Sequence, residues 1–289
     1  MMDTIIIGGG PAGVTAALYT ARAGLSTTIL YKDHGALKKA KVENFYGHME
    51  ISGKQLVEIG LEQAHHVGAN VLSEEAVGIT FEQNFTIQTT TDIHTARAVI
   101  LATGASRATP RIKGLSALEG RGVSYCAICD GFFHRGRDVA VLGHSAYAMH
   151  EIMDLLPIAN SVTLLTNGKK PAIDFPDNVI VRTEKVKEVC AQDGMLGKTL
   201  CGVLLDGGDV VELSGLFIAI GVAGGVELAR KLGAVVQNNA IFVDEKSRTT
   251  VDRLWAAGDC TEGLKQIAKA VADGAIAGTD VVKCLSPVS

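Results

Sequence analysis

Short apolar runs alternate along the chain with segments whose apolar residues recur at helical spacing, and this alternation predicts an α/β fold. The first apolar run is Thr4–Ile7, which a glycine-rich turn connects to the helical segment Val14–Ala23. A second unit of the same kind leads from the strand Asp138–Leu142 into the helical segment Met149–Leu156. Two strand-turn-helix units predict two Rossmann-like domains of the dinucleotide-binding type.

Further elements are predicted between and after these units. The strand-like segments are Thr27–Leu30, Phe85–Thr89, Ile93–Leu101, Val162–Thr166, Val179–Arg182, Leu216–Ile220 and Leu254–Ala257. Gly202–Leu205 and Val210–Leu213 flank Asp206-Gly207-Gly208-Asp209, which predicts a hairpin. An amphipathic helix begins near Lys265, and the segment Ala105–Gly114 is predicted to be an interdomain linker.

Composition indicates a folded protein and excludes several classes. Hydrophobic residues make up 47% and charged residues 20% of the 289 residues, which is enough apolar mass for packed cores. The formal net charge of −4 gives no overall attraction to nucleic acid. No apolar run reaches the ~18 residues of a membrane span. Because the chain starts without a basic segment before a long apolar one, and its 6 cysteines are too sparse for a disulfide scaffold, we expect a cytoplasmic protein.

The glycine-rich turn near the N-terminus predicts a nucleotide cofactor. Gly8-x-Gly10-x-x-Gly13 supplies one glycine for the turn, one for close approach to a pyrophosphate and one for packing of the helix on the strand. The predicted cofactor-binding residues here are Gly8, Gly10, Pro11, Ala12 and Gly13. After the next strand comes Tyr31-Lys32-Asp33, in which Asp33 is either a ribose ligand or a solvated loop residue.

A pair of cysteines stands immediately before the second unit. Cys126-Ala127-Ile128-Cys129 has the spacing of a redox pair that closes and reopens a disulfide. A zinc site would need four ligands, and no second Cys-x-x-Cys exists, so no metal is expected. Asp130 follows the second sulfur and is a candidate proton donor to a leaving thiolate. Its alternative role is capping of a helix N-terminus. Cys190, Cys201, Cys260 and Cys284 are assigned no role.

The motifs together resemble the low-molecular-weight thioredoxin reductase family of flavoproteins over nearly the whole chain. Besides the glycine turn and Cys126-Ala127-Ile128-Cys129-Asp130, the shared motifs are Val42-Glu43-Asn44-Phe45, Ala102-Thr103-Gly104-Ala105, Phe217-Ile218-Ala219-Ile220-Gly221 and Ala256-Ala257-Gly258-Asp259. The resemblance implies a homodimeric flavin-dependent disulfide oxidoreductase that passes electrons through FAD and the cysteine pair to thioredoxin. It also implies two domains, the second inserted into the first: an FAD-binding domain of residues 1–112 and 243–289, and a redox-disulfide domain of residues 113–242.

Carried over by motif, the resemblance assigns roles to individual residues. The further residues expected to bind FAD are Tyr31, Asn44, Val77, Ala102, Thr103, Gly104, Gly258, Asp259, Lys265, Gln266 and Ile267. It implies that Cys129 faces the flavin and that Cys126 attacks the partner disulfide. Lys265-Gln266-Ile267 stands where family members have Arg-Gln-Ala, and Gly35-Ala36-Leu37-Lys38 replaces Gly-Gly-Gln-Leu.

The second turn departs from the family in the region that binds NADPH. The second glycine of the turn is replaced by Ser145, whose Cβ would crowd a pyrophosphate, with His144 and Tyr147 adding bulk nearby. The expected arginine pair for a 2′-phosphate is replaced by Asn167-Gly168-Lys169-Lys170. The chain therefore resembles the branch of the family that is reduced by ferredoxin and does not use pyridine nucleotides.

Three other functions remain open from the sequence. The chain is alternatively an NADPH-dependent thioredoxin reductase with a degenerate pocket, a flavin-dependent dithiol oxidase of small molecules, or a flavin-binding module without activity. Candidate docking charges for an acidic iron-sulfur partner are Lys38, Lys39, Lys41, Arg107, Arg111 and Lys113. The inserted domain is expected to rotate about linkers near Lys113-Gly114 and Ile241-Phe242.

Overall fold

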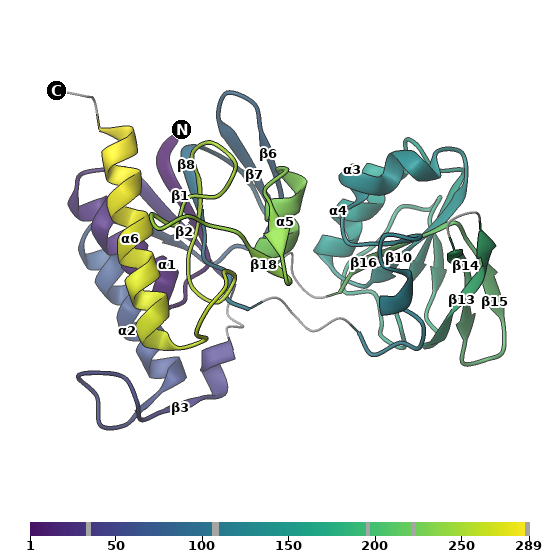
Figure 1. The fold of residues 1–289 in the computed structure, drawn as a ribbon, viewed down its shortest axis with the longest axis horizontal. Helices are drawn as coiled ribbons and strands as arrows, with labels where there is room; N and C mark the ends of the chain where they lie inside the picture. The colour runs from purple at the N-terminus through teal and green to yellow at the C-terminus, as the bar shows by residue number, and fades with distance from the viewer. Residues whose placement is uncertain (33–35, 106–109, 195–196, 221–223, 287–289) are drawn as a thin grey trace. The chain divides into compact units, whose positions relative to one another are not determined.

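A computed structural model describes residues 1–32, 36–105, 110–194, 197–220 and 224–286. The chain divides into two compact units, which are described separately. Unit 1 comprises Met1–Arg107 and Gly224–Ser289, and unit 2 comprises Ala108–Ala223 (Figure 1). Within the described ranges, no helix has both the length and the apolar character needed to cross a bilayer.

Unit 1 is built on a seven-stranded sheet in the order β5-β2-β1-β8-β7-β6, with β19 paired to β8. Its strands are β1 (Met2–Ile7), β2 (Thr27–Leu30), β5 (Asn70–Leu72), β6 (Ala76–Phe81), β7 (Phe85–Thr89), β8 (Ile93–Leu101) and β19 (Leu254–Ala256). The pairings among β5, β2, β1, β8 and β19 are parallel, whereas β7 pairs antiparallel with β8 and β6. Two-stranded sheets are formed by β3 (Lys41–Val42) with β4 (Ile51–Ser52) and by β17 (Val236–Gln237) with β18 (Ala240–Ile241).

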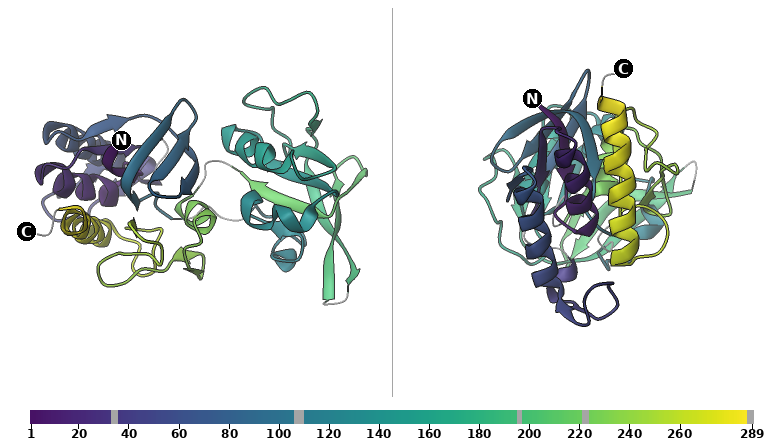
Figure 2. Two further views of the ribbon diagram at one scale, coloured as in Figure 1. Left: turned by 90° about the horizontal axis from the view of Figure 1, so that it is seen from above. Right: turned by 90° about the vertical axis from the view of Figure 1, so that its left-hand side faces the viewer.

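The long helices of unit 1 are α1 (Pro11–Arg22), α2 (Gly53–His66) and α6 (Ile267–Leu285). A shorter helix α5 (Gly225–Lys231) and a 3-10 helix η1 (Ala36–Lys39) complete the unit. Helices α2, α1 and α6 lie next to one another in Figure 2. Glycines permit the contact of α1 with α6, because a Cβ on Gly274 would lie 2.1 Å from the Ala12 carbonyl oxygen and one on Gly278 2.7 Å from that of Ala16.

Unit 2 contains a five-stranded parallel sheet and a three-stranded antiparallel sheet. The first has the order β12-β11-β10-β16-β9 and consists of β9 (Val123–Ser124), β10 (Asp138–Gly143), β11 (Ser161–Leu165), β12 (Ile180–Arg182) and β16 (Gly215–Ala219). The second consists of β13 (Val186–Gly194), β14 (Gly197–Leu205) and β15 (Val210–Glu212). The helices are η2 (Ser116–Leu118), α3 (Ala127–Asp130), η3 (Gly131–His134) and α4 (Ala146–Leu155).

The α/β prediction is confirmed, and several segments match the expected bounds. The strands at Thr27–Leu30, Phe85–Thr89 and Ile93–Leu101 have the predicted limits, and the hairpin around Asp206–Asp209 joins β14 to β15. The sequence analysis did not predict α2 or β13. Only Gly53 and Ala64 are buried on α2, but Val57, Leu61 and Ala64 follow helical spacing, so a local signal for this helix was present in the sequence.

The limits of the two units differ from the expected ones, most where the chain returns from unit 2 to unit 1. Residues 224–242, expected in the inserted domain, belong to unit 1. The amide of Gly225, at the start of α5, donates to Thr103 Oγ1 at 2.8 Å, and Ile241 is fully buried in unit 1. Near the point where the chain first enters unit 2, the Lys113 carbonyl accepts a hydrogen bond from the Val189 amide at 2.8 Å within that unit. The expected hinges at Lys113-Gly114 and Ile241-Phe242 therefore lie inside the units.

A buried carboxylate on α6 ties three segments of unit 1 together. Asp280 is 5% exposed and accepts hydrogen bonds from Trp255 Nε1 at 3.0 Å and from Arg248. Burial alone would raise the pKa of Asp280, but the hydrogen bonds from Arg248 and Trp255 outweigh it and hold the pKa below its ordinary 3.8. This contribution to stability is therefore fully present above pH 3.8 and is lost as the pH falls through the lowered value.

We expect Asp280→Asn to lower the free energy of unfolding of unit 1 by roughly 1–3 kcal/mol, because it removes a charged hydrogen-bond acceptor from a buried position. Trp255 is the single tryptophan, so its fluorescence during denaturation reports on unit 1. The matched control is Asp252→Asn, which removes the exposed partner of Arg253 and should cost less than ~0.5 kcal/mol. Equal losses in the two variants would contradict this role of Asp280.

Candidate active site

The β1–α1 turn has the geometry of a dinucleotide-binding turn. Gly8 has φ 124°, and a Cβ there would lie 2.1 Å from the Ala102 carbonyl oxygen. A Cβ on Gly13 would lie 1.9 Å from the Gly8 carbonyl oxygen. In contrast, a Cβ on Gly10 would meet nothing within 4 Å. The protein's own packing therefore requires glycine at positions 8 and 13, whereas Gly10 keeps a space open beside the turn.

The backbone N–H groups at the N-terminus of α1 face this space. Gly10 is the N-cap and Pro11 follows it, with no side-chain hydrogen bond to cap the helix and no acidic residue in its first turn. The first N–H groups of a helix have no intrahelical acceptor and carry the positive end of its dipole. The residues present therefore fit the pyrophosphate of FAD, with Gly8 to Gly13 as the groups that would hold it.

Two further turns predicted to bind FAD come next to the glycine turn. Ala102 follows β8, and its amide donates to the Ile7 carbonyl at 2.8 Å. Gly258 follows β19 with φ 81°, and a Cβ on it would lie 2.9 Å from the Ala12 Cβ. The ends of β1, β8 and β19 thus bring Ala102-Thr103-Gly104 and Gly258-Asp259 to one edge of the sheet, the edge at which ligands bind in open parallel sheets.

The start of α6 lies with Asn44 at the same site. Gln266 is the N-cap of α6, and its Oε1 accepts from Asn44 Nδ2 at 3.0 Å. Lys265 donates to the carbonyl of Asp259 at 2.7 Å and to that of Thr261, so its ammonium group holds the preceding loop. Ile267 is the first residue of α6.

The structure places the remaining predicted FAD-binding residues in different surroundings. Tyr31 lies against the glycine turn, since a Cβ on Gly9 would be 2.8 Å from the Tyr31 Cβ. Val77 is buried on β6, the strand at the end of the sheet farthest from β5. Asp33 lies outside the described residues.

The sequence analysis missed two residues that fix the Gly258-Asp259 turn. Asp273 on α6 accepts from the Gly258 amide at 3.0 Å. Lys269 pairs with Asp273 at 2.7 Å and donates to Thr261 Oγ1 at 2.8 Å. Their spacing of four residues on a predicted helix was the available signal, but only the fold brings them to the turn.

The cysteine pair forms a disulfide at the start of α3. Cys126 is the N-cap of this helix, and its Sγ accepts from the Cys129 amide at 3.2 Å. Cys126 is 3% exposed, whereas Cys129 is exposed. The two residues therefore differ in exposure, and the roles that the resemblance implies, Cys129 facing the flavin and Cys126 attacking the partner disulfide, stay predictions.

Asp130 is linked to Cys126 through Ser124. Ser124 Oγ donates to Asp130 Oδ2 at 2.6 Å and accepts from the Cys126 amide at 3.1 Å. Asp130 is the last residue of α3 and the N-cap residue of the following η3, but its side chain makes no capping hydrogen bond there. The sequence analysis missed Ser124, which has no distinguishing motif of its own.

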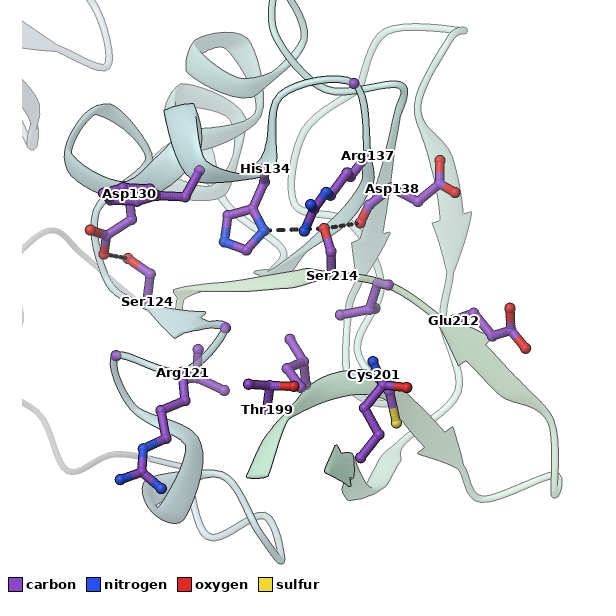
Figure 3. A pocket seen from close by; sticks show the side chains of 18 of the residues that line it. Arg121, Ser124, Asp130, His134, Arg137, Asp138, Thr199, Cys201, Glu212 and Ser214 are labelled. Carbon is purple, nitrogen blue, oxygen red and sulfur yellow. Dashed lines mark hydrogen bonds between the residues drawn. The ribbon is translucent and has the colours of Figure 1, made fainter. Parts of the chain in front are cut away.

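Asp130 and Ser124 open onto a groove of about 990 Å³ within unit 2 (Figure 3). His134 lies on its wall, where Nδ1 is 3.1 Å from Ser214 Oγ. Burial lowers the pKa of His134 below its ordinary value, Arg137 lowers it further, and the Asp130 charge opposes both. The groove gives solvent, and hence protons, a route to the Asp130 carboxyl group.

The β10–α4 turn has the backbone geometry of a nucleotide-binding turn, but a side chain and a neighbouring segment cover the position where a pyrophosphate would bind. A Cβ on Gly143 would lie 2.3 Å from the Ala219 carbonyl oxygen, so this glycine has the packing role of Gly8. Ser145 is the N-cap of α4, as Gly10 is of α1, and carries a side chain there. The His144 carbonyl accepts from the Ala172 amide at 2.7 Å, so the chain after β11 lies against the turn.

The arrangement of cationic residues near this turn also differs from that of a site that binds a 2′-phosphate. Arg182, at the end of β12, pairs with Glu184 at 2.7 Å and with Asp209 at 2.8 Å. Lys169 and Lys170 are exposed. Tyr147, expected to add bulk to a nucleotide pocket, is only 2% exposed and packs inside unit 2.

The matched variants Gly10→Ala and Gly13→Ala separate cofactor binding from folding. Gly10 has ordinary extended dihedral angles and open space, so its alanine variant should fold and bind FAD about tenfold or more weakly. Gly13→Ala should lower thermal stability, because its Cβ would overlap the Gly8 carbonyl. Flavin absorbance per chain and thermal unfolding measure the two effects. Full flavin loading of Gly10→Ala would contradict the assigned role of Gly10.

Comparisons with known proteins agree with this geometry. A model of the pyridine nucleotide-disulphide oxidoreductase family matches residues 2–274. The thioredoxin reductase of Listeria innocua is 32% identical over 296 residues, which cover 97% of this chain and 93% of the relative.

Two solved structures match over nearly their whole length. The atypical thioredoxin reductase TRi from Desulfovibrio vulgaris Hildenborough is 35% identical with a TM-score of 0.90, and 100% of each chain is covered. The ferredoxin-flavin thioredoxin reductase from Clostridium acetobutylicum is 28% identical with a TM-score of 0.72, and 98% of each chain is covered. The chain therefore belongs to the pyridine nucleotide-disulphide oxidoreductases and, among them, to the thioredoxin reductase family of FAD-dependent enzymes.

Proposed function

We propose that this enzyme reduces thioredoxin with electrons that it receives from a ferredoxin. FAD, when bound, supplies the conversion between one-electron and two-electron transfer. The Cys126–Cys129 disulfide accepts the electron pair, and the resulting dithiol passes it to the partner disulfide. The observation that carries the choice of donor is the β10–α4 turn, where Ser145 stands at the helix N-cap and the Ala172 amide binds the preceding carbonyl.

This turn disfavours a nicotinamide nucleotide for steric and electrostatic reasons. A pyrophosphate approaches such a turn closely only where the backbone has no side chain, as at Gly10 in unit 1. A 2′-phosphate is normally held by an arginine fork, and the Arg182 guanidinium is engaged by two carboxylates. The similar Clostridium acetobutylicum enzyme is a ferredoxin-flavin thioredoxin reductase, which supports the same donor class here.

The transfer is favourable in energy. A plant-type ferredoxin lies near −400 mV and thioredoxin near −270 mV, so a two-electron transfer between them releases roughly 6 kcal/mol. No feature of the described residues favours a dithiol oxidase. The homodimer and the cytoplasmic location stay predictions.

The lysines proposed for ferredoxin docking are partly neutralised. Lys41 pairs with Glu43 at 2.6 Å and with Glu50 at 3.0 Å, and Lys113 pairs with Glu188 at 2.9 Å. Lys38, Lys39 and Arg111 are exposed, and Arg107 lies outside the described residues. Exposed ion pairs are weak, so these lysines can still exchange partners on docking.

The chain's own residues carry out thiol–disulfide exchange. One thiolate attacks the partner disulfide, which forms a mixed disulfide and releases a partner thiolate. The second cysteine then attacks the mixed disulfide, which re-forms Cys126–Cys129 and releases the second partner thiolate. Asp130 can protonate a leaving thiolate and regain the proton from the groove.

Anaerobic reduction assays test the donor. Reduced ferredoxin should bleach the flavin and support reduction of thioredoxin, whereas NADPH should do neither, because its pyrophosphate has no open turn to bind. Cys129→Ser is the control, since it should leave bleaching by ferredoxin intact and abolish reduction of thioredoxin. Bleaching by NADPH within seconds, with no response to ferredoxin, would identify an NADPH enzyme instead.

Trapping with thioredoxin tests which sulfur attacks. The exposure of Cys129 favours it over Cys126 as the sulfur that forms the mixed disulfide. With a thioredoxin that lacks its second cysteine, Cys126→Ser should trap the partner at Cys129, and Cys129→Ser should trap little. A non-reducing gel measures the adduct. The reverse preference would restore the order implied by the resemblance.

A further inference from the structure

Glu151 is a buried carboxylate that the proposed thiol–disulfide exchange does not use. It lies on α4 with 1% of its surface exposed. Its Oε2 accepts from the Ala127 amide at 2.7 Å. Ala127 is the first residue of α3 and stands between the two cysteines, 24 positions before Glu151. A buried carboxylate therefore contacts the backbone of the disulfide ring itself.

Helix α4 also contacts the segments on both sides of this ring. Tyr147 donates a long hydrogen bond of 3.4 Å to the Tyr125 carbonyl, just before Cys126. A Cβ on Gly131 would lie 3.1 Å from Leu155 Cδ2, so the chain after Asp130 packs closely on α4. Burying a charged group raises the free energy of the folded state unless hydrogen bonds compensate. The hydrogen bond from the Ala127 amide supplies part of this compensation for Glu151.

We propose that Glu151 is a positioning residue for the Cys126–Cys129 pair: it anchors the start of α3 through the Ala127 amide, and its negative charge disfavours ionisation of Cys126. The proposal rests on this pair being the working disulfide. It does not depend on the identity of the electron donor.

The physical basis is the backbone amides beside Cys126. An N–H group that donates to a thiolate stabilises its charged form and lowers its pKa. The Cys129 amide already points at Cys126 Sγ, but Glu151 occupies the Ala127 amide and adds a negative charge nearby. With both thiols protonated, the disulfide takes up two electrons and two protons on reduction, and each thiol that ionises lowers the proton count by one.

Other titratable groups also face this region. Asp130 belongs to α3 and His134 to η3, and Tyr125 and Tyr147 bracket the ring. On α4, the side-chain ligand atoms of His150, Glu151 and Asp154 lie within 4.8 Å of one another. His150 and Asp154 therefore respond to a substitution of Glu151, and the measured shift includes that response.

The pH dependence of alkylation of Cys126 tests the charge. In FAD-loaded full-length protein carrying Cys129→Ser, iodoacetamide labelling of Cys126 is followed by peptide mass spectrometry, which separates it from the other cysteines. Glu151→Gln keeps an acceptor for Ala127 and removes the charge, so labelling at pH 7 should rise roughly tenfold, the effect of a pKa lower by about one unit. Asp206→Asn, which alters an exposed carboxylate of unit 2, should change nothing.

A second pair of variants tests the anchor. Glu151→Asp keeps the charge but is one methylene too short to reach Ala127, so Cys126 should label faster at high pH, where it is fully ionised, with an unchanged midpoint. Glu151→Ala should show both effects. If Glu151→Ala does not fold, the Gln and Asp variants still decide the question. A Glu151→Gln profile that superimposes on the parent would overturn the proposal, whatever the outcome of the ferredoxin and thioredoxin assays.

Discussion

The close approach of backbone to backbone at the β1–α1 turn is the constraint on which the cofactor site depends. Gly13 rests against the Gly8 carbonyl, and Gly8 against that of Ala102. Any larger residue at either position would push the helix away from the sheet or separate β1 from the chain after β8. These contacts fix the N-terminus of α1 at the edge of the sheet, and Gly258 joins it there through its contact with Ala12.

The same strand-turn-helix unit serves a different purpose in unit 2. Gly143 keeps the packing contact with the neighbouring strand, so the backbone geometry persists. The surface of the turn is closed by Ser145 and by the chain at Ala172. Helix α4 instead turns Tyr147 and Glu151 toward the disulfide segment. One supersecondary structure thus keeps an open turn that fits a cofactor in unit 1 and contacts the disulfide segment in unit 2, which is consistent with function residing in sites and not in folds.

The two sulfurs have different surroundings although they belong to one small ring. Cys126 is enclosed by contacts from Ser124 and the Cys129 amide, while Cys129 is exposed. The two carboxylates near the ring are separated in the same way. Asp130 communicates with the groove, and Glu151 lies in the interior. The ring is therefore buried at Cys126 and exposed at Cys129.

The sequence by itself determined the elements and motifs that depend on neighbours along the chain. Strand and helix periodicity, the glycine turn and the Cys-x-x-Cys spacing are local, so β2, β7, β8 and the disulfide could be predicted. Helix α2 was not predicted, although Val57, Leu61 and Ala64 have helical spacing and its signal was therefore also local.

Only the tertiary structure decided which distant residues meet. Glu151 reaches Ala127 from another helix, Asp273 reaches Gly258 across a turn, and α5 packs beside Thr103 from 122 positions away. The exposure of Cys129 and the burial of Cys126 were likewise outside the reach of sequence, because burial is a property of packing. Spacing along a chain specifies local backbone geometry, whereas hydrogen bonds between distant segments exist only once the core has brought those segments together.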